Sequence, residues 1–150
     1  MSYPCLALPR VLALVGAVLL VSAFFMPWFS SQGLLLSGQF LYQFLSNPGD
    51  LRRFLPGSSG SPAEAQLLRA LVDLFPACGA IAFLAALVGG FGWRLAMNVI
   101  LGLAGAIPLI GWAVGITRLP PGANPEIGLW VIAGSSLAVL VGLALDLRSD

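Results

Sequence analysis

Four long apolar stretches divide the chain, and the polar residues gather between them. The stretches run over residues 11–29, 71–91, 95–116 and 127–145. Each is close to the ~20 residues that a helix needs to cross a hydrocarbon core about 30 Å thick. The pattern predicts an all-α protein: an integral membrane four-helix bundle, formed by a single transmembrane domain over residues 1–150.

The second stretch belongs to a longer predicted helix. Residues 61–64, Ser-Pro-Ala-Glu, combine an N-cap serine, a proline at the first helical position and a glutamate three residues after the cap. From this start the helix is expected to run through Arg69 and Asp73 into the membrane, with a kink at Pro76. Arg69 and Asp73 are four residues apart, so we predict that they form an interfacial pair.

Residues 30–69 form the one long connection, which is predicted to lie outside the membrane. Between Leu34 and Ser46 its apolar side chains follow helical spacing, and glutamines lie on the opposite face. We therefore predict an amphipathic segment that lies as a cap on the bundle. The predicted apolar face of the cap consists of Phe40, Leu41, Phe44 and Leu45, and the predicted polar face of Gln39, Gln43 and Ser46.

Small residues recur at helical spacing in the last two stretches. Gly111 and Gly115 are four residues apart in the third stretch, and Gly134, Ala138 and Gly142 continue the same spacing in the fourth. Small side chains let helix backbones approach closely, which favours helix association in lipid. We predict that these residues make helix contacts. The spacing leaves open whether the contacts are made within this chain or with a neighbouring subunit.

The composition supports a membrane protein and excludes several kinds of chemistry. Hydrophobic residues make up 59% of the chain and charged residues 9%, against about 25% charged in soluble domains. The formal net charge is +1 and no basic tract exists, so nucleic acid is not an expected partner. The chain has no histidine, which excludes Ser/His and Cys/His catalysis and the common zinc sites. We predict no catalytic residue, no metal and no cofactor, and we do not expect an enzyme.

The arginines alone do not determine the orientation. With the termini on one side, that side holds Arg10, Arg94 and Arg148, and the other side holds the remaining four. Arg10 precedes the first stretch with no acidic residue among the first ten. We therefore expect a multi-pass protein of the cell membrane with both termini in the cytoplasm.

The exit from the first stretch carries a short motif. Residues 25–29, Phe-Met-Pro-Trp-Phe, place aromatic side chains of the kind found at headgroup level, and Gly33 and residues 36–38, Leu-Ser-Gly, follow them. The motif resembles small uncharacterised bacterial four-span membrane proteins in which a Pro-Trp exit leads into a short extracytoplasmic segment. The chain is superficially similar to claudin-like tetraspans as well, although it lacks their loop cysteine pair. The resemblance implies a topology and no activity.

Three functions fit these observations. The leading hypothesis is a non-catalytic accessory subunit of a larger bacterial membrane complex, respiratory or photosynthetic, that packs against other membrane subunits. A small-molecule or lipid carrier is an alternative, because broken helices mark transporter sites. Pro76 and Pro108 would break two helices, and Asp73 and Asn98 are expected near a cavity. A scaffold that self-assembles through the fourth helix is the third. The expected partners are the lipid bilayer and other membrane subunits or further copies of the chain.

Overall fold

Helices make up most of the structure, a computed structural model that describes residues 8–31, 33–46, 61–88, 94–117, 119 and 122–148. The elements, in chain order, are α1 (Leu8–Ala23), β1 (Pro27–Ser31), β2 (Leu34–Ser37), α2 (Gly38–Phe44), α4 (Pro62–Val88), α5 (Arg94–Thr117), β3 (Asn124–Pro125) and α6 (Ile127–Arg148). The predicted helical character is confirmed for this part of the chain. The sheet was not predicted.

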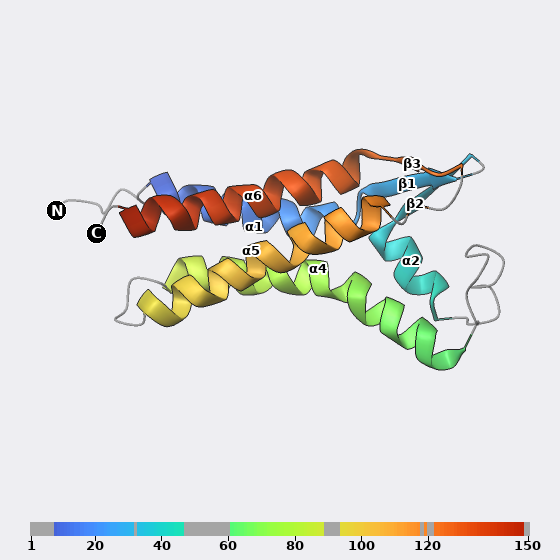
Figure 1. Ribbon diagram of the computed structural model, residues 1–150, viewed down its shortest axis with the longest axis horizontal. Coiled ribbons are helices and arrows are strands. Elements are labelled where there is room, and N and C mark those ends of the chain that lie inside the picture. The colour runs from blue at the N-terminus through green and yellow to red at the C-terminus, as the bar shows by residue number, and fades with distance from the viewer. Residues whose placement is uncertain are drawn as a thin grey trace.

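The four longest helices lie side by side (Figure 1). α1 packs against α4 and α6, and α5 packs against the same two helices, so the contacts close into a ring. Three of the helices, over Ala65–Val88, Arg94–Thr117 and Ile127–Arg148, are long and apolar enough to cross a membrane. The chain is therefore a membrane protein. The start of α1 and the end of α6 lie at one end of the molecule, and the sheet and α2 lie at the other (Figure 1).

The first apolar stretch is not the single helix predicted for residues 11–29. α1 has 16 residues and ends at Ala23, and Pro27–Ser31 forms β1. Pro27 has no N–H with which to continue a helix. The indole Nε1 of Trp28 donates to the carbonyl of Ala23 at 2.8 Å, which satisfies an acceptor that the helix end leaves free.

The three strands form an antiparallel sheet in the order β2-β1-β3. Phe29 is opposite Leu36 on one side and Pro125 on the other. Gly33, in the turn that follows β1, has φ +80°, a left-handed conformation that glycine adopts without steric cost. The sheet thus joins the segment after α1 to the segment before α6.

The cap helix is shorter than the predicted amphipathic segment, because residues 34–37 pair with β1 as a strand. α2 begins at Gly38, and the hydroxyl of Ser37 caps it by accepting from the backbone N–H of Phe40 at 3.2 Å. A Cβ at position 38 would lie 2.6 Å from a ring carbon of Trp28, so only glycine fits where the chain enters this helix.

The longer second helix begins as predicted. α4 starts at Pro62, and the N–H of Ala65 donates to the carbonyl of Ser61 at 3.1 Å. Pro76 lies inside α4, which bends along its length (Figure 1). The helix runs to Val88, whereas the predicted span over 71–91 continues into residues outside the described part. α5 and α6 agree with their predicted stretches to within three residues.

Candidate functional site

The predicted small-residue face of α6 is divided between the interior and the surface. A Cβ on Gly142 would lie 2.6 Å from the carbonyl oxygen of Pro9. A Cβ on Gly16 would lie 3.1 Å from the Cβ of Ala138. Ala138 and Gly142 therefore lie against α1. Gly134 is exposed, and a Cβ there would have no atom within 4 Å.

The predicted pair in α5 is divided in a similar way. A Cβ on Gly111 would lie 2.9 Å from the Phe75 ring of α4, and a Cβ on Gly115 would meet no atom within 4 Å. Gly111 thus accommodates an aromatic ring, and neither glycine contacts another helix backbone in the described chain.

The sequence analysis missed Gly16, which makes the closest approach in the middle of the α1–α6 contact. A Cβ there would lie 2.8 Å from the carbonyl oxygen of Ser135. The small residues Ala13, Gly16 and Ala17 have helical spacing and were the available signal.

Trp28 joins the bundle to the cap end. Its side chain is buried within the protein, and its ring lies edge-on to Phe75 with centroids 5.1 Å apart. A Cβ on Gly128 would lie 2.8 Å from the indole ring, so α6 also approaches it closely. Trp28 therefore holds β1, the end of α1, α4 and the start of α6 together.

The predicted apolar face of the cap turns only partly inward. α2 packs against α4, with Leu45 buried and Leu41 and Phe44 half-buried. Phe40 is 42% exposed and stacks on Phe44 with centroids 6.2 Å apart. The predicted polar residues Gln39, Gln43 and Ser46 are exposed.

Arg69 does not form the predicted pair with Asp73. Between these two described residues the structure shows no ion pair, and Asp73 lies on an exposed part of α4. The Arg69 guanidinium lies over the ring of Tyr42, 4.0 Å from its centroid, and donates to the Tyr42 hydroxyl. Tyr42 offers both a π face and an acceptor, which the prediction did not consider because Tyr42 lies 27 residues away in the chain. The contact fastens α2 to α4.

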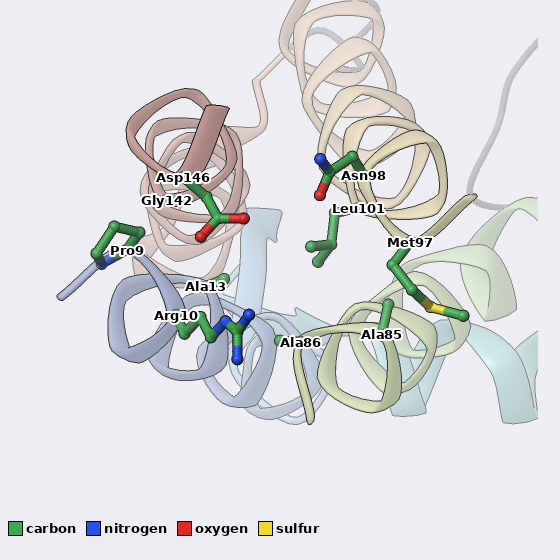
Figure 2. A pocket seen from close by; sticks show the side chains of 10 residues that line it. All are labelled: Pro9, Arg10, Ala13, Ala85, Ala86, Met97, Asn98, Leu101, Gly142 and Asp146. Carbon is green, nitrogen blue, oxygen red and sulfur yellow. The ribbon is translucent and has the colours of Figure 1, made fainter. Parts of the chain in front are cut away.

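A small polar pocket lies at the opposite end, between the four long helices (Figure 2). Arg10 from α1, Asn98 from α5 and Asp146 from α6 point into it (Figure 2). Alanines and other apolar residues line the rest, and the cavity volume is about 20 Å³. A polar cavity of this size is large enough for one water molecule.

The close approach at Gly142 brings the charged residues of this pocket together. It sets the start of α1 against the end of α6, and Asp146 follows Gly142 by one helical turn. An arginine and a carboxylate in one small pocket balance each other in charge, which favours a water-filled contact between helix ends over a site for a free ion. Within the described residues, no group of three or more His, Cys, Asp or Glu side chains is placed to hold a metal. This pocket has no local signal in the sequence, because its polar residues come from three distant segments.

The cap end differs from this pocket in its surface chemistry. Leu34 and Leu35 of β2 are 52% and 63% exposed, and Phe40 of α2 adds a third exposed apolar side chain. We call these three residues the apolar tip.

Comparisons of the chain with known protein families, curated proteins and solved structures gave no match. The functional argument therefore rests on the geometry of the chain.

Proposed function

We propose that this chain is a non-catalytic subunit of a larger membrane complex, and that it binds a partner protein through the apolar tip. The observation that carries the proposal is the exposure of Leu34, Leu35 and Phe40 at the end of the molecule that holds the sheet. Exposed apolar side chains outside the lipid favour a protein contact there.

Two arguments support a position of the apolar tip outside the hydrocarbon. Lipid-exposed sheet edges do not occur within a bilayer core, because their backbone groups would have no partner there. β2 and β3 are both edge strands. In addition, Trp112 near the end of α5 and Trp130 near the start of α6 lie 5.8 Å apart, and tryptophans concentrate at the membrane interface.

The tip is held on a fixed support, which favours binding. Trp28 joins β1 to the helices, and the Arg69–Tyr42 contact fastens α2 to α4. A preformed surface loses little conformational entropy when a partner binds.

The proposal includes four membrane crossings. α1 is about 24 Å long at ~1.5 Å per residue, and the turn residues Phe24–Met26 extend it toward the thickness of the core. The described ends of α1 and α6 lie at one end of the molecule, as an even number of crossings requires (Figure 1). We propose that this end is cytoplasmic, because Arg10 begins the first crossing.

Extraction in a mild detergent followed by native mass analysis tests the proposed function. We expect the wild type to run with at least one other chain and Leu35→Glu to run alone, because a carboxylate in an apolar contact loses its hydration. Gln43→Glu is the matched control, since it adds the same charge at an exposed site on α2. A wild type that runs only as a free monomer would contradict the proposal, as would a Leu35→Glu variant that keeps its partner.

A further inference from the structure

A second apolar feature lies on the side of the bundle, where α4 and α5 leave a groove between them. Its volume is about 470 Å³. The lining is almost entirely apolar and includes Leu68 and Phe75 from α4 with Ile107, Gly111 and Gly115 from α5.

The groove has the depth of a single leaflet. From Ile107 to Gly115, α5 rises about 12 Å at ~1.5 Å per residue, and half of a hydrocarbon core is roughly 15 Å. Gly115 is two residues from the end of α5 at Thr117, so the groove starts at the cap-side surface of the membrane and runs inward. Both helices that form it are long and apolar enough to cross the membrane.

The shape favours a thin occupant over a partner helix. A partner helix would approach closely at Gly111, but the Phe75 ring already covers that position. The open space begins at Gly115, where a Cβ would meet no atom within 4 Å.

An arginine lies at the depth of the groove's outer end. Leu68 lines the groove, and the next residue is Arg69, whose half-buried guanidinium lies on Tyr42. An arginine carries five N–H donors, so the bond to the Tyr42 hydroxyl leaves donors for a phosphate. A hydrocarbon groove that ends at an arginine complements a phospholipid, which joins an acyl chain to a phosphate at the same depth.

We propose that this groove binds one acyl chain of a phospholipid from the cap-side leaflet, with the lipid phosphate at Arg69. The bound lipid fills the space beside Phe75, and Phe75 contacts Trp28. The groove lies apart from the apolar tip, and Arg69 is the one residue that also supports the tip, through Tyr42.

Native mass spectrometry of the detergent-purified full chain, with phosphatidylglycerol added in steps, measures this binding. Gly115→Leu fills the groove, and we expect at least a tenfold loss of bound lipid. Gly134→Leu is the matched control: it is the same change at another helical glycine with no atom within 4 Å, and it lies outside the groove. We expect Gly134→Leu to bind lipid within twofold of the wild type. Circular dichroism and thermal melting of both variants check that each is folded.

A second variant tests the phosphate end. Arg69→Gln should weaken phosphatidylglycerol several-fold and leave diacylglycerol, which has the chains without the phosphate, unchanged. Equal lipid binding by Gly115→Leu and the wild type would overturn the proposal, as would equal losses in Gly115→Leu and Gly134→Leu. A Gly115→Leu variant that keeps its lipid but loses an oligomer would instead show that a helix occupies the groove.

Discussion

The contact between α1 and α6 and the contact between α4 and α5 use glycine in different ways. Along α1 and α6, Gly16 and Gly142 each lie against the backbone of the other helix. Along α4 and α5, Gly111 accommodates a phenyl ring, and Gly115 opens onto a groove. The spacing of small residues therefore shows where close approach is possible, and the rotation of each helix decides whether the space beside a glycine holds a backbone, a ring or an open groove.

The largest expected effect on stability is found by comparing the same change, glycine to leucine, at one position in each contact. Gly142→Leu should lower the free energy of unfolding by about 3 kcal/mol or more, because its Cβ would meet the backbone of Pro9 and Ala13, which cannot move aside. Gly115→Leu should change it by less than about 0.5 kcal/mol. Reversible unfolding of both variants in mixed micelles measures the difference. Equal losses would show that the two contacts are alike.

Trp28→Phe should have the next largest effect. The change removes the indole donor and leaves the Ala23 carbonyl without this partner, at a cost of about 1–3 kcal/mol. The same unfolding assay measures it. The smaller ring also leaves a gap beside Phe75 and Gly128, which adds to the loss. A change below about 0.5 kcal/mol would therefore show that Trp28 does not stabilise the end of α1.

Tyr42→Phe should cost about 1 kcal/mol or less, because the ring remains under Arg69 and only the hydroxyl acceptor is lost. Asp73→Asn should leave stability unchanged, since Arg69 lies on Tyr42 instead. Protease sensitivity of the segment between α2 and α4 measures the attachment of the cap. An Asp73→Asn variant that loosens the cap more than Tyr42→Phe would restore the originally predicted pair.

Gly134→Leu should also have little effect on stability, because a Cβ there would meet no atom within 4 Å. It is also the variant that separates a self-assembling scaffold from a subunit of a mixed complex. Analytical ultracentrifugation of the purified chain should show the same oligomeric state with and without the change. Loss of a homo-oligomer in Gly134→Leu would favour the scaffold.

The features that local sequence determines were predictable. The start of α4 at Pro62 follows from its serine cap and proline. The apolar stretches that form α5 and α6 are long enough to predict helices that cross a membrane. The run from Ala23 to Phe29 is apolar without a period, so hydropathy alone could not show where the helix ends and the strand begins. The pairing of Phe29 with Pro125 joins residues far apart in the chain and has no local signal.

In the candidate sites, too, the features with a local signal were predictable and those that depend on how helices dock were not. The cap was predictable as an amphipathic helix, but its outward Phe40 and the strand beside it depend on how α2 docks on α4. The partner of Arg69 was mispredicted because the nearest acid in sequence is not the nearest acceptor in space. The polar pocket could not be predicted, because its polar residues meet only where α1, α5 and α6 come together at one end of the molecule.

Photo-crosslinking from position 35 in intact membranes tests the proposed partner contact most directly. A photoreactive amino acid replaces Leu35 in one sample and the exposed lipid-side residue Leu137 of α6 in another. We predict a crosslink to a different protein from position 35 and crosslinks mainly to lipid from position 137. Crosslinks from position 35 only to lipid, or only to the chain itself, would contradict the proposal that the apolar tip binds a partner protein.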